Sequence, residues 1–286
     1  MIDIDALQPW LGRERCAADE VSATQARRMA ALLDLEPRQW AGGDALPAHW
    51  YCMLFGETAR QSQLGTDGHP EKGDFLPPVM LPRRMFAGRR VQFQRSLHIG
   101  EQVVRRTRIQ AITPKRGRSG EMCFVTLRHD IDGEQGTAVV EEQDIVYRQA
   151  SPPRQASADK PPELPARREM PTLGATSITP DTTMLFRYSA ITFNGHRIHY
   201  DRDYASGVEG YPGLVVNGGL TLLLLWEQAR QSGLAFSTSV SRNLKGLIAG
   251  QPLYIRTEQR ETGTTIYALD AAGEVAVEAV LAGESA

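Results

Sequence analysis

A short run of polar residues in the second half of the chain contains groups suited to acid–base chemistry. The run Asn194–Asp201 reads Asn-Gly-His-Arg-Ile-His-Tyr-Asp, so it holds two imidazoles, a carboxamide and a phenol. Imidazole titrates closer to neutral pH than other side chains, and a positioned histidine is the commonest general acid or base. The run therefore predicts a proton-transfer site. A histidine that serves only the local structure is the alternative from these residues alone.

A helix that opens with glycines follows further along the chain. The run Gly213–Leu220 reads Gly-Leu-Val-Val-Asn-Gly-Gly-Leu and leads into the apolar helical pattern of Gly218–Gln231. Free backbone N–H groups at a helix N-terminus can hold developing negative charge. An ordinary helix start, with glycines that admit close packing, is the alternative. A base, a polar partner and an anion pocket together indicate acyl-group chemistry.

The overall composition is typical of a globular protein without affinity for nucleic acid or membranes. Of the 286 residues, 41% are hydrophobic and 23% are charged, and the net charge is −2. This balance gives no general attraction to phosphates, and the densest apolar run, Leu222–Trp226, is too short to span a bilayer. Three cysteines without C-x-x-C spacing indicate neither a disulfide framework nor a zinc site, and Met1–Leu11 lacks signal-peptide features. We therefore expect a cytoplasmic location.

The elements that must position these groups divide the chain into two similar halves. Seven prolines in residues 151–180 predict an extended linker between a domain at 1–150 and a domain at 181–286. In the first half we expect helices at Ser22–Leu35 and His49–Phe55, a capping box at Ser22 and Gln25, and strands at Arg90–Leu97, Gln102–Thr113, Met122–Ile131 and Thr137–Tyr147. In the second half we expect a helix at Gly218–Gln231 and strands at Met184–Thr192, Ser237–Leu244, Leu253–Glu261, Thr264–Asp270 and Val275–Leu281.

The two halves also contain a matching segment. Leu97–Thr107 aligns with Leu247–Thr257 at a constant offset, with Leu, Gly, Arg and Thr matching in place. A chance match is the alternative, because glycine before an alternating strand is common. Both halves nevertheless read as a helix followed by an antiparallel meander.

This order of elements predicts an α+β fold of the double hot-dog type, in which two antiparallel sheets each wrap a helix. The segment Leu220–Leu225 is apolar on nearly all sides, as a helix enclosed by a sheet must be. Two such sheets can pair edge to edge, which buries strand edges that would otherwise be exposed.

The same motifs resemble those of the MaoC-like hydratase/dehydratases, also called R-specific enoyl-CoA hydratases. The resemblance is carried by Asn194–Asp201 and Gly213–Leu220 in the second half. In the first half, Gly65–Pro70, Phe75–Pro78 and Leu81–Gly88 look like the non-catalytic partner domain of the double hot-dog subgroup. That subgroup includes mesaconyl-CoA and itaconyl-CoA hydratases and mitochondrial-type hydroxyacyl-thioester dehydratases. The resemblance covers nearly the whole chain.

The resemblance implies a catalytic role for four residues. The family's usual signature has an acid five positions before a histidine, and these positions are Asn194 and His199 here. The double hot-dog subgroup is similar in using Asn. Because a carboxamide cannot act as a base, His199 would be the sole general base and Asn194 would orient the water. Gly218 and Gly219 would hold the enolate oxygen on their N–H groups.

The substrate residues follow from the resemblance and from charge. A dicarboxyl thioester needs a cation for its free carboxylate, and a bidentate arginine is the natural choice. The expected substrate-binding residues are His196, Arg197, Asn217 and Arg84, with Arg187 and Arg242 as further carboxylate candidates and Lys245 for the CoA phosphates. His196 and His199 also have a spacing that metal ligands use, but no third ligand is apparent, so no metal site is expected.

The resemblance therefore predicts a hydro-lyase that reversibly hydrates an enoyl-CoA thioester without a cofactor. The favoured substrate is a short branched dicarboxyl one, mesaconyl-CoA or itaconyl-CoA, which would give citramalyl-CoA. Three alternatives remain: a 3-hydroxyacyl-thioester dehydratase acting on acyl-carrier protein, a hot-dog thioesterase, and a non-catalytic acyl-thioester-binding protein. Pairing into a homodimer is also expected from the resemblance.

Overall fold

The computed structural model describes residues 2–117, 120–149, 176–261 and 263–283. The strands of the first half are β1 (Glu14–Glu20), β2 (Arg83–Phe93), β3 (Gln102–Gly117), β4 (Gly120–Gly133) and β5 (Gly136–Arg148). Its helices are α1 (Ile4–Leu7), α2 (Ala23–Leu32) and short 3-10 helices at Gln8–Trp10, Ala48–Met53 and Gln61–Gln63.

The second half begins with a short strand and two helices. Its strands are β6 (Thr176–Ile178), β7 (Thr238–Asn243), β8 (Leu253–Arg260), β9 (Gly263–Leu269) and β10 (Val275–Ala282). Its helices are α3 (Thr182–Thr192) and α4 (Gly218–Gln231), with a 3-10 turn at Arg197–His199 and a π-helical turn at Tyr204–Val208. None of the helices in the described ranges is long and apolar enough to cross a membrane.

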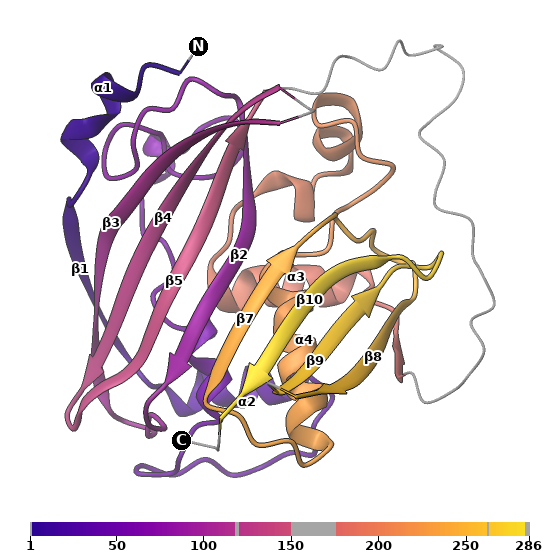
Figure 1. Ribbon diagram of the computed structural model, residues 1–286. Helices are drawn as coiled ribbons and strands as arrows, with labels where there is room; N and C mark the ends of the chain where they lie inside the picture. Colours follow the sequence, from indigo (N-terminus) through magenta and orange to yellow (C-terminus); the bar gives the residue numbers. More distant parts are fainter. Residues whose placement is uncertain (1, 118–119, 150–175, 262, 284–286) are drawn as a thin grey trace.

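All ten strands belong to one antiparallel sheet with the order β1-β3-β4-β5-β2-β7-β10-β9-β8-β6 (Figure 1). The two five-stranded halves join where β2 pairs with β7, from Gly88 opposite Arg242 to Gln92 opposite Thr238. The register of β2 with β5 shifts between Phe86 and Gly88. A side chain at position 88 would overlap the carbonyl oxygen of Ser241, so glycine permits the close approach of the halves.

The matching segments of the two halves occupy equivalent places. Leu46 N–H donates to the carbonyl of Leu97 in the first half, and Val216 N–H donates to the carbonyl of Leu247 in the second, at 2.7 and 2.8 Å. The glycine three positions after each of these leucines has a positive φ, 89° and 76°, which favours glycine at the turn. The sequence match at Leu97–Thr107 thus reflects a structural repeat.

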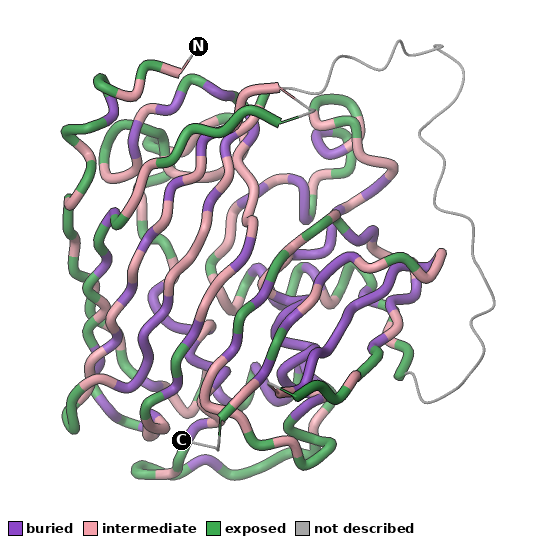
Figure 2. The backbone as a smooth tube through the Cα atoms, in the orientation of Figure 1, coloured by how far each residue is buried: buried purple, intermediate pink, exposed green. Residues whose placement is uncertain are grey.

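The core is centred on helix α4, which the strands of the second half wrap (Figures 1 and 2). Nine of its fourteen residues are buried, among them Leu220, Leu223 and Trp226. In the first half, the place of such a long helix is taken by the short 3-10 helix Ala48–Met53, which contacts α4. His49 from this 3-10 helix donates its Nε2 hydrogen to the carboxylate of Glu227 in α4 at 2.9 Å, which links the two halves through the core.

Most expected elements are present, but one assignment was wrong. Met184–Thr192 forms part of helix α3 and not a strand, with buried residues Leu185, Tyr188 and Ser189 at helical spacing. Its N-cap is Asp181, whose side chain accepts from Met184 N–H at 2.7 Å. Strand β2 begins at Arg83, seven residues before its expected start.

The capping box and the linker were predicted only in part. Ser22 caps α2 by accepting from Thr24 N–H at 3.2 Å, but Oε1 of Gln25 is buried without a hydrogen-bond partner among the described residues. Most of the expected linker, residues 151–175, lies outside the described residues. Near its C-terminal end, Thr176–Ile178 forms the edge strand β6. The polar edge strand β1 was not foreseen.

Candidate active site

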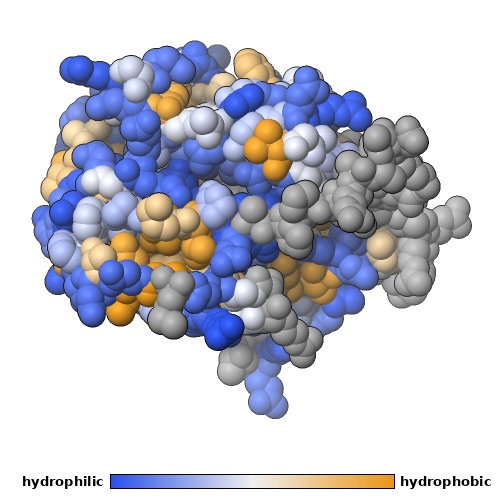
Figure 3. Space-filling view, turned by 90° about the horizontal axis from the view of Figure 1, so that it is seen from above, coloured by the Kyte–Doolittle hydropathy of each residue, from blue (hydrophilic) through white to orange (hydrophobic). Residues whose placement is uncertain are grey.

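A cavity of about 1060 Å³ is lined by residues of both halves. The four expected catalytic residues and the four main expected substrate-binding residues line this cavity: Arg84, Asn194, His196, Arg197, His199, Asn217, Gly218 and Gly219. Its lining also includes exposed apolar side chains, Phe186, Phe193 and Leu244. Seen from above, the described surface is mostly hydrophilic, with hydrophobic side chains gathered in a few patches (Figure 3). The cavity can therefore accept a ligand that is partly polar and partly apolar.

His199 is held as a neutral imidazole with one defined tautomer. Its Nδ1 lies 2.7 Å from the carbonyl oxygen of Val215, which can only accept, so Nδ1 carries the hydrogen. The side chain is 7% exposed. Burial lowers the pKa of His199 to about 4, although the hydrogen bond to Val215 opposes this and a charge on His69 would add to it. The other nitrogen, Nε2, makes no hydrogen bond in the described part of the chain and is free to accept a proton.

The N-terminus of helix α4 presents unpaired backbone donors to the same cavity. Asn217 is the N-cap but its side chain does not cap the helix, and Thr221 is the first residue whose N–H bonds back to Asn217. Within the described residues the N–H groups of Gly218 and Gly219 therefore have no backbone acceptor. A side chain at position 219 would overlap the hydroxyl of Tyr188, so only glycine fits beside this tyrosine.

The base and the helix start are joined by a very short stretch of chain. Val215 fixes the ring of His199, and Gly218 follows three residues later. Three residues span at most about 10 Å even when fully extended. An imidazole lone pair and the positive end of a helix dipole thus face one cavity at a distance fixed by the backbone.

Asn194 organises the loop that carries the histidines. It follows Phe193, the left-handed C-cap of α3 with φ 51°, and its N–H bonds to the carbonyl of Ser189. The side-chain Oδ1 accepts from His196 N–H at 3.0 Å. The carboxamide oxygen is therefore engaged in the loop, and the NH₂ group remains to bind a water or a substrate oxygen.

His196 and Asn217 are both buried cavity residues. His196 is 9% exposed, and its ring centroid lies 5.3 Å from that of His199. Burial, with charges on His69 and His199 next in importance, lowers the pKa of His196 to about 2, so the ring is neutral. Asn217 is 2% exposed and donates weakly to Ser189 Oγ at 3.4 Å, while its Oδ1 has no hydrogen-bond partner among the described residues.

The arginines differ in their freedom to bind a substrate. Arg197 pairs with Asp201 at 2.7 Å and donates to the carbonyl of Thr66 at 3.0 Å, so its guanidinium holds two loops together. Arg187 and Arg242 do not line the cavity, and Arg242 pairs with Glu278. Lys245 does line the cavity, and there it pairs with Asp270.

Arg84 is the best placed of the expected cations. Its side chain is 10% exposed, and its guanidinium lies 3.6 Å from the carboxylate of Asp67. Its Nε is buried without a hydrogen-bond partner among the described residues. A buried guanidinium with spare donors can bind a ligand carboxylate.

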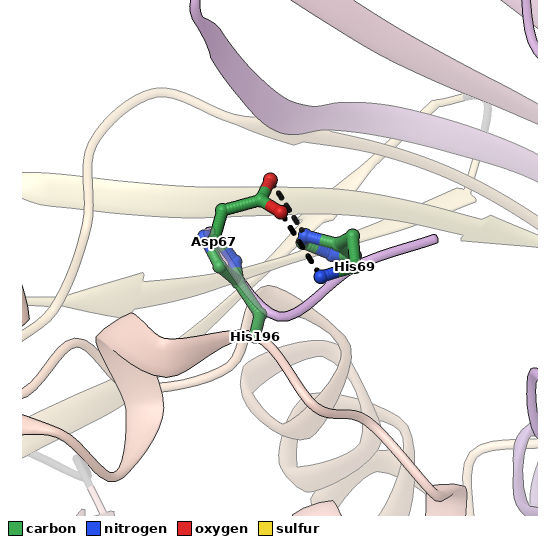
Figure 4. Close-up of side chains that lie close together, drawn as sticks. All are labelled: Asp67, His69 and His196. Carbon is green, nitrogen blue, oxygen red and sulfur yellow. Dashed lines mark hydrogen bonds and ion pairs between the residues drawn. The ribbon is translucent and has the colours of Figure 1, made fainter. Parts of the chain in front are cut away.

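A loop of the first half contributes two residues that the sequence analysis did not single out. Asp67 accepts from the ring Nδ1 of His69 at 3.2 Å and from its backbone N–H at 3.0 Å (Figure 4). The ring centroid of His69 lies 4.2 Å from that of His196. The motif Gly65–Pro70 resembles part of a non-catalytic partner domain, and only the fold shows that it meets a histidine loop far away in the sequence.

Two glycines allow these loops to touch. Gly68 has a φ of 85°, and a side chain there would overlap the carbonyl oxygen of Gly195. A side chain at Gly195 would in turn come within 2.8 Å of the carbonyl oxygen of Gly68. Next to this contact, Arg197 N–H donates to the carbonyl of Asp67 at 2.9 Å. The loop of the first half is therefore fixed against the histidine loop by backbone contacts.

Asp67, His69 and His196 also form the one group in the described ranges whose atoms could hold a metal ion, with ligand atoms within 4.8 Å of one another. The carboxylate is already bonded to His69, and the charge of Arg84 lies 3.6 Å away. A second cation at this point would be opposed by that guanidinium. The expectation that no metal takes part stays a prediction.

Comparisons with known proteins identify the family and the fold of this chain. Residues 48–245 match the family model of hydroxyacyl-thioester dehydratase type 2. The chain is 46% identical over 223 residues to mesaconyl-C(4)-CoA hydratase of Chloroflexus aurantiacus. The aligned region covers 77% of each of the two chains. A solved MaoC-like dehydratase superposes with a TM-score of 0.72 at 13% identity, covering 98% of this chain and all of that one. A Mycobacterium tuberculosis protein described as a double hot-dog fold superposes with a TM-score of 0.53 at 15% identity, covering 95% of each chain, and the predicted fold is thereby confirmed.

Proposed function

The chain belongs to the hydroxyacyl-thioester dehydratase type 2 family and is a MaoC-like hydro-lyase, and we propose that it reversibly hydrates a short branched dicarboxyl enoyl-CoA thioester. The substrate would be mesaconyl-CoA or itaconyl-CoA and the product citramalyl-CoA. The observation that carries the proposal is the neutral His199, held by Val215 with Nε2 free, in one cavity with the unpaired N–H groups of Gly218 and Gly219.

The proposed reaction uses one water and two kinds of protein group. Nε2 of His199 takes a proton from water as the water oxygen bonds to the β carbon of the enoyl group. The electron pair of the double bond moves toward the thioester oxygen, where the N–H groups of Gly218 and Gly219 hold the enolate charge. The NH₂ group of Asn194 orients the water. The proton then passes from His199 to the α carbon, which gives the 3-hydroxyacyl thioester and returns the imidazole to its neutral form, and the reverse sequence dehydrates the product.

Arg84 is proposed as the residue that binds the free carboxylate. In a mesaconyl-C4 thioester this carboxylate is attached to the β carbon, so its cation must lie close to the base. Arg84 is near the histidines through Asp67, and its Nε is unpaired in the described part of the chain. Arg105 also lines the cavity with a buried, unpaired Nε, but it stacks on Phe55 at 5.0 Å, near Glu57 and Glu141. We therefore assign the carboxylate to Arg84.

An assay of the purified protein with mesaconyl-CoA, itaconyl-CoA and crotonyl-CoA tests the function. Loss of enoyl absorbance with formation of the hydroxyacyl product, fastest for a dicarboxyl substrate, is the expected result. Equal or faster turnover of crotonyl thioesters, or of 3-hydroxyacyl thioesters of acyl-carrier protein, would support the family's dehydratase activity instead. Release of free thiol would indicate a thioesterase, which the uncharged Asn194 disfavours because such enzymes use a carboxylate. Binding of a thioester without loss of enoyl absorbance and without release of thiol would indicate a non-catalytic thioester-binding protein.

We further propose that the enzyme needs no cofactor and acts as a cytoplasmic homodimer. Each step above uses only side chains and backbone groups of this chain. The cysteines Cys16, Cys52 and Cys123 are free thiols, which suits a reducing compartment. Light scattering of the purified protein measures the oligomeric state, and a mass equal to one chain would contradict the dimer.

A further inference from the structure

Hydration creates a buried positive charge that the residues around His199 do not balance. When His199 accepts a proton it becomes an imidazolium with Nδ1 bonded to a neutral carbonyl. Asn194 in the same loop has no charge, and no carboxylate lies within hydrogen-bonding distance of His199 or His196 in the described residues. A buried cation without a counter-charge is costly, because burial penalises the charged form.

One carboxylate in the described ranges does reach the histidine cluster, and it comes from the other half of the chain. Asp67 is bonded to His69, which packs on His196, and His196 packs on His199, at centroid separations of 4.2 and 5.3 Å. Asp67 is 27% exposed in its side chain and His69 likewise. Although burial opposes ionisation, bonding to His69 and the charge of Arg84 hold the pKa of Asp67 well below its usual range.

We propose that Asp67 and His69 are positioning residues of the reaction, and that Asp67 supplies the counter-charge for the proton held by the cavity imidazoles. This inference rests on the proposed function. The reaction centre is then composite, because the first half contributes to catalysis and does not only support the fold. The loops of Gly68 and Gly195 are in direct contact, and this contact packs His69 of the first half against His196 of the second half.

The step balances without any further reactant. Water loses one proton to Nε2 of His199, the oxygen–carbon bond forms at the β carbon, and the thioester becomes an enolate. The three imidazoles then hold one extra proton, opposite the charge of Asp67. That proton passes to the α carbon, the enolate returns to a thioester, and the imidazoles are neutral again. Only one of the three rings is expected to be protonated at a time, because a charge on one imidazole lowers the pKa of the neighbouring imidazoles.

Other charged side chains near the three histidines also affect their protonation. Arg84 lies 3.6 Å from Asp67, and Glu57 is the next carboxylate that acts on His69. Lys72 donates to the carbonyls of Val79 and Leu81 and is turned to that loop. Burial lowers the pKa of His69 and bonding to Asp67 raises it. The charge of Asp67 also raises the pKa of His196, so removing that charge makes His69 and His196 harder to protonate.

The test compares Asp67→Asn with the charge-keeping variant Asp67→Glu, using the full-length enzyme and mesaconyl-CoA. Asp67→Asn is expected to lower kcat on the order of 100-fold, with KM nearly unchanged, since acid–base groups contribute in that range. Its acid limb in kcat/KM should move to lower pH. Asp67→Glu keeps a carboxylate beside His69, so its kcat should be at least about tenfold above that of Asp67→Asn, with the acid limb of the wild type.

His69→Gln, with His98→Gln as its matched control, completes the experiment. His98 lies outside the cavity, 37% exposed and 3.8 Å from Glu101, so its variant should keep the wild-type rate. Circular dichroism and thermal unfolding identify any variant that fails to fold, and the comparison of Asp67→Asn with Asp67→Glu then decides. A purely structural role for Asp67 predicts no shift of the acid limb, and it predicts that Asp67→Glu, with its longer side chain, is at least as slow as Asp67→Asn. That result would overturn the inference. Wild-type enzyme that hydrates none of the thioesters would instead overturn the proposed function.

Discussion

His199 donates its Nδ1 hydrogen to the carbonyl oxygen of Val215 across 2.7 Å, and this bond fixes which nitrogen can act as a base. The acceptor belongs to the segment that leads into helix α4, so the base and the anion-binding helix end are aligned by the same few residues. A shift of that segment would move both groups together.

Replacing His199 by Gln should abolish most of the hydratase activity. The amide can still donate to Val215 and fill the space, but it cannot accept a proton from water. We expect kcat to fall about 1000-fold, within the range that acid–base groups contribute. Enoyl absorbance with mesaconyl-CoA measures the rate. A variant that keeps more than a tenth of the wild-type rate would remove His199 from the role of base.

The pH dependence of kcat/KM should show an unusually acidic limb. The base must be neutral to accept a proton. Burial is the main cause that lowers the pKa of His199 to about 4. Activity should thus be constant above about pH 5 and fall as the pH approaches the pKa, whereas an unperturbed histidine would lose activity below about pH 6.5. Rates between pH 4 and pH 8 at constant ionic strength, about 0.1 M, measure this. A limb near the ordinary histidine pKa would mean that water reaches the ring freely.

Gly219→Ala should lower kcat on the order of 100-fold by displacing a donor of the enolate oxygen. The new methyl group would overlap the hydroxyl of Tyr188, and the helix start must move. Combining it with Tyr188→Phe removes that hydroxyl and should restore part of the rate. If the double variant is as slow as Gly219→Ala alone, the overlap with Tyr188 is not the cause.

Arg84→Gln should reduce selectivity for the dicarboxyl substrate. Loss of a charged hydrogen bond to the free carboxylate costs about 1.5 to 3 kcal/mol, which corresponds to roughly a 10- to 150-fold rise in KM for mesaconyl-CoA. Crotonyl-CoA has no second carboxylate. Its KM is therefore the internal control, because it would report any disturbance of the neighbouring Asp67 that the Arg84 change causes. An equal change for both thioesters would argue that Arg84 does not bind the carboxylate.

Glu227→Gln should destabilise the fold, and the effect should depend on pH. The buried carboxylate accepts from His49 and Arg230, and although burial opposes ionisation these bonds lower its pKa to about 2. A depressed carboxyl pKa stabilises the fold above the unfolded value of about 4.3, and this stabilisation is lost as the pH falls toward 2. Urea unfolding should show a loss of about 2 kcal/mol at neutral pH. The difference between wild type and variant should shrink on acidification, and a difference that is constant with pH would exclude this mechanism.

Much of the fold was readable from sequence, most easily in β3 and β4, where buried residues alternate with exposed or partly exposed ones. The error at Met184–Thr192 has a physical cause. This segment is rich in residues that strands also favour, and its buried side chains follow a helical spacing over too few turns to stand out. The cap at Asp181 was the signal that could have identified the helix. Strand β1 was missed because its burial alternates only between partly exposed and exposed residues.

The second-half residues of the site were foreseen because they lie in two compact motifs. In the sequence, Asp67 and His69 are visible only as part of a partner-domain motif, because their approach to His196 depends on the tertiary contact between Gly68 and Gly195. Local patterns do not encode such a contact. The charge of Arg84 is visible in the sequence, but its burial and its place in the cavity, which distinguish it from Arg187 and Arg242, arise only from the fold.

The pairing of β2 with β7 has a consequence for how such an enzyme can diverge. Two copies of one module that sit in a single polypeptide always meet in equal numbers, at any concentration in the cell. Neither copy then has to remain self-complementary, so one can shorten its central helix and donate a loop while the other retains the helix end that faces the acyl group. Division of labour between duplicated modules is thereby inherited as one unit.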